Sequence, residues 1–358
     1  MKRASRMLSS SVLVALSITI VWLYGGDLSP PDGPVSSTMK TLDEVEPRTP
    51  ISSLPFTIDT SGSYYLTDNL IGAPPLAPPP PGIIPIPQDG IKIDADDVTL
   101  DLNGFSLIGV EFSQSGINVP SPHTNITIRN GTIRDWGFNG VNAGQAFNSQ
   151  LTGLLVRGNV ASGLILGQGN IVGCTSGNNG QFGIIPIIDC TVIGCTARGN
   201  GTVGIDAQQS CRIHDCVAVF NGGKGIDGRV GSIITACVAN NNAIGITGTH
   251  GGAFGLTGDG ITVRGCAVSS NTGDGIVVGE NSLIVGNKCD KNGTGGTGAG
   301  IHVLGTDNRI EANTVTLNDF GVDVDGAGNY VTANSARGNT TMNFDVAGGN
   351  TATGNVEF

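Results

Sequence analysis

The chain has 358 residues, 57 of them glycine, a formal net charge of −11 at pH 7 and only 5% aromatic residues. This acidic balance, with a pI near 4.6, argues against nucleic-acid phosphate or an anionic membrane surface as the partner. Glycine is more than double its usual share of about 7% but shows no three-residue period, which excludes a collagen-like chain.

The first 26 residues have the composition of an export signal. Basic residues at positions 2, 3 and 6 precede an apolar stretch from Leu8 to Tyr24, and this order is typical of a secretory signal peptide. No cleavage site with small residues is clear before Asp27, so an uncleaved N-terminal membrane anchor is the alternative interpretation. In either case we expect the rest of the chain to be exported, to the periplasm, the cell surface or the medium.

Residues 27–50 are rich in acids and prolines and are interpreted as a linker and N-terminal cap. Thr41 and Glu44 have the spacing of a helix capping box. This spacing predicts a single helical turn that covers the open end of the following domain and ends before Pro47.

One pattern returns every 21 residues from Cys174 to Gly245, where an apolar residue stands three positions before a cysteine and an asparagine five positions after it. The cysteines of this column are Cys174, Cys195, Cys216 and Cys237, and the asparagines are Asn179, Asn200, Asn221 and Asn242. Further along the chain in both directions, the asparagine column continues as Asn159, Asn271, Asn292, Asn318 and Asn339. A fixed period indicates stacked units of one kind.

These repeats predict an all-β fold, a right-handed parallel β-helix over residues 51–358. A period of about 21 residues is too short for two packed helices and suits a coil of three short strands. Runs of Val, Ile and Thr between Gly and Asn have strand and turn chemistry, and Tyr64–Leu66 and Val98–Leu102 are expected strands of the first coils. We expect the column asparagines at bends, because Asn tolerates the left-handed region and can bond to the amide of the next coil.

Three segments are predicted to loop out of the stack. Residues 73–88 are rich in proline, which cannot donate to a strand ladder, so they form a surface loop that is either a plain insertion or a ligand for a proline-reading partner. Added residues at 248–256 and 294–299 interrupt the period on both borders of one outward strip. Loops that flank a rigid strip can form the walls of a groove.

The eight cysteines leave three interpretations open. The spacing of Cys190, Cys195, Cys211 and Cys216 suggests a zinc site. Cys190 and Cys211 are also one period apart, which favours a second inward column of buried free thiols. Because neighbouring coils lie about 4.8 Å apart, disulfides between coils are the third interpretation for an exported protein.

Segments 46–58, 62–70, 90–109 and 125–137 resemble bacterial exported right-handed β-helix proteins, most of them without an assigned function. Their repeats are similar to those of pectate lyases, alginate epimerases and NosD-type periplasmic proteins. The resemblance covers nearly all of residues 45–358 and implies the fold. It carries over no catalytic residue, because the Asp-Pro-His-Glu signature of alginate epimerases and the Arg-x-Lys element of polygalacturonases are absent. Residues 271–276 are similar to the polygalacturonase Asn-Thr-Asp element, but the repeat itself predicts Asn271, Gly275 and Ile276, so the similarity is given no weight.

Candidate functional residues lie on the outward column that follows each Gly–aliphatic pair. Asp206 and Asp227 are neighbours in this column, and His302 adjoins Asp323. Like carboxylates one coil apart raise a pKa or gather a cation, which suits general acid and base chemistry; a solvated face without function explains each group equally simply. The candidate catalytic residues are Asp206, Asp227, Arg229, His302 and Asp323, and the candidate binding residues are His250, Glu280 and Asp325.

No cofactor is expected. Calcium is the one ion worth considering, because Asp323–Gly326 begins like a calcium loop, although the remaining EF-hand ligands are missing. No residue is assigned as a metal ligand.

Two classes of function stay open. The first is an exported scaffold or glycan-binding β-helix without catalysis, favoured by the missing motifs and the few aromatic residues that a sugar platform needs. The alternative is a polysaccharide lyase, epimerase or hydrolase that uses the acidic and histidine strip, an inference that rests on fold analogy. We expect a polysaccharide or cell-surface glycan as partner, no nucleic acid, no membrane contact beyond an N-terminal anchor, and a monomer.

Overall fold

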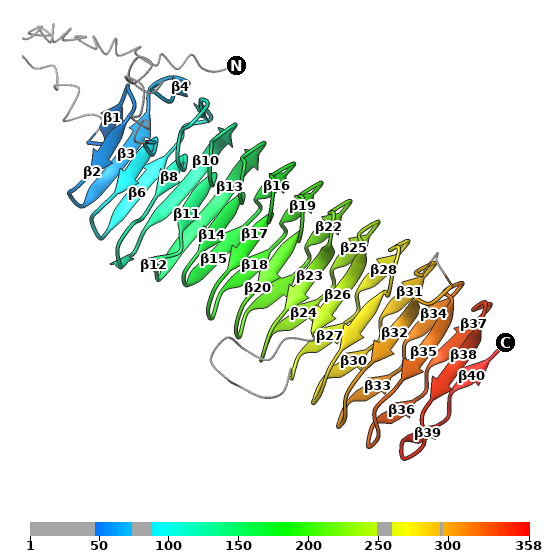
Figure 1. The fold of residues 1–358 in the computed structure, drawn as a ribbon. Helices are drawn as coiled ribbons and strands as arrows, with labels where there is room; N and C mark the ends of the chain where they lie inside the picture. Colours follow the sequence, from blue (N-terminus) through cyan, green and yellow to red (C-terminus); the bar gives the residue numbers. More distant parts are fainter. Residues whose placement is uncertain (1–46, 74–86, 249–259, 294–295) are drawn as a thin grey trace, which may run out of the picture. The chain divides into compact units, whose positions relative to one another are not determined.

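The computed structural model describes residues 47–73, 87–248, 260–293 and 296–358. The predicted signal or anchor, nearly all of the linker, most of loop 73–88, residues 249–256 of the first insertion and residues 294–295 of the second therefore lie outside the described residues. Arg48–Phe358 form one compact unit, and the regular elements described in it are β-strands (Figure 1). Within the described ranges no helix has the length and apolar character needed to cross a membrane.

A 13-stranded parallel sheet receives one strand from each coil. Its strands, in order, are β2 (Phe56–Ile58), β5 (Ile91–Ile93), β8 (Ile117–Asn118), β11 (Val141–Ala143), β14 (Leu164–Leu166), β17 (Ile184–Pro186), β20 (Ile205–Ala207), β23 (Lys224–Gly228), β26 (Ile244–Gly248), β29 (Ile276–Val278), β32 (Ala299–Val303), β35 (Phe320–Val324) and β38 (Met342–Val346).

A 25-stranded sheet holds the other two strands of each coil, in two rows joined by long strands. The first row is β1 (Thr49–Ile51), β3 (Gly62–Leu66), β6 (Val98–Asp101), β10 (Thr127–Arg134), β13 (Ser149–Arg157), β15 (Gly169–Val172), β18 (Thr191–Ile193), β21 (Arg212–His214), β24 (Ile233–Thr235), β27 (Thr262–Arg264), β30 (Leu283–Val285), β33 (Arg309–Glu311), β36 (Tyr330–Thr332) and β39 (Thr351–Thr353). The second row is β4 (Leu70–Ile71), β7 (Ser106–Ile108), β16 (Thr175–Gly177), β19 (Thr196–Arg198), β22 (Val217–Val219), β25 (Val238–Asn240), β28 (Ala267–Ser269), β31 (Lys288–Asp290), β34 (Thr314–Thr316), β37 (Ser335–Arg337) and β40 (Val356–Glu357). The small strands β9 (His123–Thr124) and β12 (Ala146–Phe147) pair with each other.

The register confirms the predicted parallel β-helix with three short strands per coil. Val192 pairs with Ile213 and Ile213 with Ile234, so equivalent residues of successive coils stand 21 positions apart. These aliphatic side chains are fully buried. Because an inward residue recurs in each strand of the coil, the core is one continuous apolar column enclosed by the two sheets.

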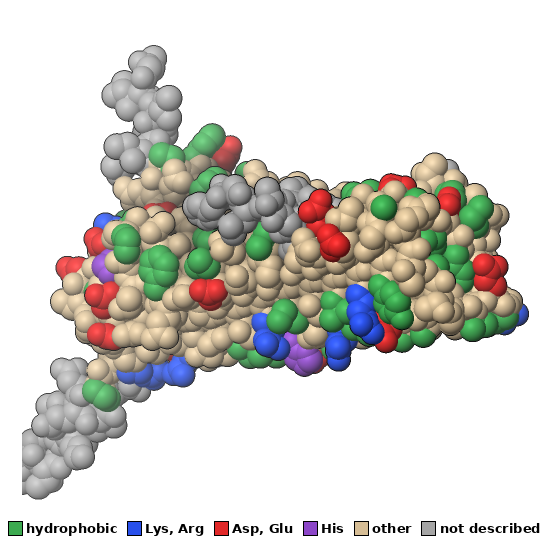
Figure 2. Space-filling model, turned by 90° about the horizontal axis from the view of Figure 1, so that it is seen from below, with side chains coloured by type: hydrophobic (Ala, Val, Ile, Leu, Met, Phe, Trp, Pro, Cys, Tyr) green, Lys and Arg blue, Asp and Glu red, His purple; other side chains and the backbone are tan. Residues whose placement is uncertain are grey.

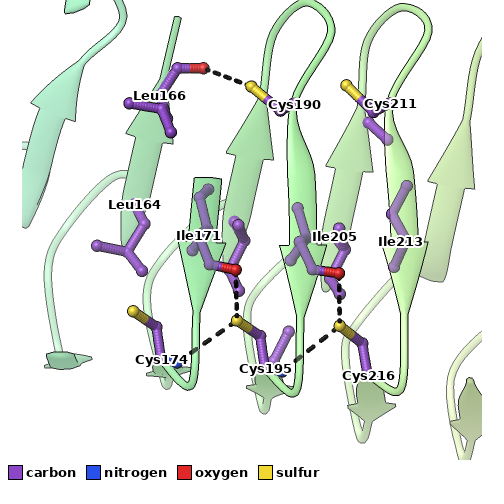
Figure 3. Packing of buried hydrophobic residues seen from close by; sticks show 14 of the residues in the cluster. Leu164, Leu166, Ile171, Cys174, Cys190, Cys195, Ile205, Cys211, Ile213 and Cys216 are labelled. Carbon is purple, nitrogen blue, oxygen red and sulfur yellow. Dashed lines mark hydrogen bonds between the residues drawn. The ribbon is translucent and has the colours of Figure 1, made fainter. Parts of the chain in front are cut away.

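The cysteines lie inside this core as free thiols, all eight of them buried. Figure 3 shows Cys174, Cys195 and Cys216 at one bend of successive coils, with Cys190 and Cys211 at another. The backbone N–H of Cys174 donates to Sγ of Cys195 at 3.4 Å, and that of Cys195 to Sγ of Cys216 at 3.5 Å. The structure therefore favours the thiol columns over disulfides. The zinc interpretation is wrong for the described residues, whose one group of three potential ligands within mutual reach contains no cysteine.

Asparagine takes over the role of cysteine in later coils. The N–H of Cys266 donates to Oδ1 of Asn287 at 2.9 Å, and the N–H of Asn287 to Oδ1 of Asn313 at the same distance. The side chain at this position accepts the bend N–H of the preceding coil, whether through sulfur or oxygen. A second ladder runs through Asn200, whose N–H and Nδ2 both donate to Oδ1 of Asn221 at 3.0 Å. The predicted amide bonds between coils are thus confirmed.

The reason given for asparagine at the bend needs correction. The column asparagines Asn179 and Asn221 are not the left-handed residues. The positive φ belongs to the residue before each of them, Asn178 (φ 53) and Phe220 (φ 57). Asn is required in the column because a buried bend leaves backbone N–H groups that need an acceptor.

Candidate functional site

The predicted outward column exists as one register on the 13-stranded sheet. Its members pair across strands β5 to β38, with Asp206 opposite Asp227, His302 opposite Asp323 and Asp323 opposite Asp345. In a parallel stack, neighbouring members are about 4.8 Å apart. Thr247 and Val277 separate Asp227 from His302. The structure therefore divides the predicted site residues into two groups.

The first group is buried, so the interpretation of Asp206 and Asp227 as a solvated face is wrong. Their residues are 4% and 5% exposed. Gln208 Nε2 donates to Asp206 at 2.5 Å, and Arg229 Nη2 lies 3.6 Å from the same carboxylate. Arg229 thus places a positive charge beside the buried carboxylate of Asp206, as burial requires.

Asp227 is held in the same way. Lys224 Nζ donates to its Oδ2 at 2.8 Å, and the hydroxyl of Thr247 donates to its Oδ1. Breaking a buried pair of this kind by removing one partner is strongly destabilising. This arrangement favours a structural role for Asp206, Asp227 and Arg229.

The second group is centred on His302 and remains partly open to solvent. Nδ1 of His302 lies 3.2 Å from Oδ2 of Asp274, and Nε2 lies 3.2 Å from Oδ2 of Asp325 and 3.8 Å from Oδ2 of Asp323. The side chains of His302, Asp274 and Asp323 are about one-fifth exposed, and that of Asp325 is 60% exposed. The imidazole thus lies among three carboxylates on an accessible part of the sheet face.

The charges of this group are set by those contacts. The hydrogen bond that His302 donates to the Asp274 carboxylate raises the pKa of His302 to about 9, against a lowering by partial burial. His302 is therefore a positively charged imidazolium at neutral pH. Burial raises the pKa of Asp323, while the neighbouring His302 charge opposes that rise. Neighbouring titratable groups with shifted pKa values, such as His302 and Asp323, mark a candidate functional site.

Asp274 is the member that the sequence reasoning missed. It precedes β29, and its Oδ1 accepts a 2.6 Å hydrogen bond from the backbone N–H of Ala299, the first residue of β32. The carboxylate of Asp319 binds the same loop through the N–H groups of Gly296 and Gly298. The insertion predicted at 294–299 is therefore attached, in its described part, to the carboxylates around the site. The sequence did contain a signal for Asp274, because this residue lies in segment 271–276, whose similarity to the Asn-Thr-Asp element was set aside in favour of the repeat.

The remaining candidates are less informative. His250 lies outside the described residues. Glu280 follows β29 and is exposed, and its backbone carbonyl accepts hydrogen bonds from Gly260 and Ser282.

A metal ion is the one cofactor with a candidate position. One nitrogen of His302 and one oxygen each of Asp323 and Asp325 lie within 4.8 Å of one another. Calcium prefers six to eight oxygen ligands, whereas this group supplies two carboxylates and an imidazole. Because His302 is protonated at neutral pH, a metal would have to displace that proton. Calcium binding therefore stays a prediction.

A second polar cluster lies at the N-terminal end of the same sheet face. Lys92 Nζ donates to Asp94 at 2.8 Å, and His123 Nε2 lies 3.3 Å from the other oxygen of that carboxylate. The contact with Lys92 and the weaker contact with His123 hold the pKa of Asp94 at about 2. Lys92 lies in β5, and Asp94 directly follows that strand.

Comparison with known proteins supports the fold. A family model described as "Right handed beta helix region" matches residues 186–341, and no curated protein sequence matches the chain. The chain is similar to the A-module of mannuronan C-5 epimerase AlgE6 from Azotobacter vinelandii, with a TM-score of 0.62, 17% identity, and coverage of 83% of this chain and 91% of that chain. For the AlgE4 A-module of the same organism the values are 0.58, 16%, 82% and 91%. At these identities the similarity shows a shared fold.

Proposed function

We propose that this right-handed parallel β-helix protein binds a polysaccharide along the outward face of its 13-stranded sheet, with His302 as the polar centre of the site. The observation that carries the proposal is the position of His302, whose two ring nitrogens face Asp274 and Asp325 on an accessible part of the strip. Fixed donors and acceptors on a rigid scaffold are what recognition of hydroxyl-rich ligands requires.

The register suits a linear ligand. His302, Asp323 and Asp345 occupy consecutive coils of the same column, at intervals of about 4.8 Å. A sugar chain that lies along the stack would meet a polar group on each coil. The carboxylates that the imidazolium holds in place accept hydrogen bonds from sugar hydroxyls.

The charge of the strip limits the ligand class. Asp274, Asp323, Asp325 and Asp345 surround a single imidazolium, so the strip repels polymers that carry carboxylates or sulfates. A neutral polysaccharide, or one that carries amino groups, fits this face. The two epimerases with the same fold act, by their names, on mannuronan, which supports a polysaccharide ligand in general terms and leaves its identity to the charges of this strip.

The test is a binding series with the full chain against neutral, amino-bearing and acidic polysaccharides. We expect binding to the first two classes and a loss of at least about tenfold in His302→Gln and Asp274→Asn, because each change leaves a partly buried polar group without its partner. Asp215→Asn is the matched control, since Asp215 is exposed at a bend beside β21. Unchanged binding in both site variants would refute the proposal.

A second candidate function is hydrolysis of the bound polysaccharide. It is favoured by the raised pKa of Asp323 next to the charged His302 and the exposed Asp325, since glycosidases need one protonated and one ionised carboxyl group. Product analysis separates the two functions. Release of reducing ends that is lost in Asp323→Asn, with binding retained, would establish an enzyme; binding without products would establish a recognition protein.

Export is part of the same proposal and rests on the first 26 residues. Cells that express the full chain should contain the protein outside the cytoplasm, and N-terminal sequencing will show whether the segment is removed. Retention in the cytoplasm would contradict this part of the proposal.

A further inference from the structure

Cationic side chains gather on the 25-stranded sheet, whereas the proposed site lies on the 13-stranded sheet. Nine of them lie in strands of the 25-stranded sheet: Arg129, Arg134, Arg157, Arg198, Arg212, Arg264, Lys288, Arg309 and Arg337. Strands of the 13-stranded sheet carry two, Lys92 and Lys224. Figure 2 shows Lys and Arg side chains collected, together with hydrophobic ones, along the lower margin of the stack.

Most of these cations have no anionic partner of their own. Three are paired: Arg129 with Asp101, Arg134 with Asp135, and Arg309 with Glu311. For the other six, all exposed, no carboxylate within 4.0 Å is found in the described part of the chain. These six, named here the basic track, are Arg157, Arg198, Arg212, Arg264, Lys288 and Arg337. Asp290 is the one further acid in these central strands, and it accepts a hydrogen bond from Thr316.

The basic track follows the stack axis. Arg198 lies in β19 and Arg212 in the next coil, Arg264 lies in β27 and Lys288 in the next coil, and Arg337 lies in β37. With a rise of about 4.8 Å per coil, successive unpaired charges stand one or two coils apart. The six lie in four columns. Arg157, Arg198 and Arg337 share one column, which also holds Asn240, Ser269, Asp290 and Thr316, and Arg212, Arg264 and Lys288 each lie in a column of their own.

We propose that the basic track binds a linear acidic polysaccharide, one that carries carboxylate or sulfate groups along its length. Charge complementarity sets the class of ligand, because unpaired cations spread along the length of the sheet attract a polyanion while the acidic strip of the other sheet repels it. The interleaved hydroxyl groups match the hydroxyl groups of sugars. The protein then has two polysaccharide-binding faces of opposite charge, and this second face does not depend on the His302 site.

A nucleic acid fits this face less well than a polysaccharide. Binding of single-stranded nucleic acid uses free aromatic faces for base stacking. Two rings near the track each have a guanidinium group over one face, which leaves less free ring surface for stacking: Arg198 lies 5.6 Å from the centroid of Phe220, and Arg309 lies 5.4 Å from that of Tyr330.

The experiment measures binding of the full chain to polygalacturonate and dextran sulfate over a range of salt concentrations. We expect the affinity to fall steadily as the salt concentration rises. Each of Arg212→Gln and Arg264→Gln should weaken binding roughly two- to fivefold, which is the effect expected for the loss of one exposed ion pair. The double variant should lose roughly tenfold, because the two sites are two coils apart and their effects multiply. Lys92→Gln is the matched control, with the same change in charge on the other sheet, and should bind as the unchanged protein does.

Each result of this experiment either supports the proposed binding by the basic track or refutes it. Equal losses in Lys92→Gln and the arginine variants would show a non-specific charge effect, and unchanged binding in the double variant would show that the track is not the site. Tighter binding to a single-stranded oligonucleotide or to anionic vesicles, or salt-dependent self-association without binding of either polymer, would also overturn the proposal. His302→Gln should leave binding of the acidic polymers intact, so failure here and failure of the proposed function are distinguishable.

Discussion

Asp274 holds His302 at Nδ1 through one carboxylate oxygen, at 3.2 Å, while its other oxygen accepts the N–H of Ala299 at 2.6 Å. The same carboxylate therefore joins the start of β32 to the imidazole that β32 presents. Ring orientation, ring charge and the position of the neighbouring insertion all depend on this one side chain.

We predict that Asp274→Asn lowers the pKa of His302 from about 9 toward the unperturbed value of about 6.5. The hydrogen bond to a charged carboxylate is the largest cause of the raised pKa, and an amide does not stabilise the imidazolium in the same way. An NMR titration of the His302 ring measures the change. Asp307→Asn, an exposed acid elsewhere, is the control and should leave the titration as it was.

Stability should also depend on pH through His302. Its folded-state pKa is raised, so its contribution is fully present below pH 6.5 and is lost as pH rises through about 9. We expect the free energy of unfolding to fall by about 1–3 kcal/mol over that interval. His302→Gln should remove this part of the profile. Urea unfolding at a series of pH values is the measurement, and a parallel decline in both proteins would assign it to other groups.

The asparagine ladder should be a major source of stability. Asn221 accepts from the N–H and Nδ2 of Asn200, and its own Nδ2 donates to Ala197 and Asn242. Asn221→Ala leaves a buried N–H of Asn200 without an acceptor, which should cost about 2–4 kcal/mol. The exposed Asn170 in β15 is the matched control, and its change to Ala should cost less than about 0.5 kcal/mol. Equal effects in denaturant unfolding would show that the ladder is not the cause.

The eight thiols should be unreactive in the folded protein. All are buried, so a thiol reagent has no access to them, and burial in addition raises the pKa of Cys289. Titration of the native chain without reductant should find essentially no reactive thiol, and the unfolded chain should yield all eight. A smaller yield on unfolding would reveal disulfides formed during export.

Much of the fold was readable from the sequence because a solenoid repeats its local constraints. The 21-residue period, the inward cysteines and the amide ladder each follow from which residue types recur, and a repeat unit contacts only its neighbours. The outward column was also predictable, since alternation along a strand and register between coils leave little freedom. The pairing of His302 with Asp323 needed no more than that.

What the sequence could not show was which charges end up together and which are covered. Asp274 reaches His302 across a coil boundary at the end of an insertion whose path no period describes. Asp206 and Asp227 looked exposed by alternation but are buried and ion-paired. The basic track is spread over 181 positions in a chain of net negative charge, so composition concealed it. The recurrence of residue types determines the stacked fold, because stacking depends on the local geometry of each coil. The electrostatic potential at the surface depends on distances between side chains of different coils, which only the tertiary structure decides.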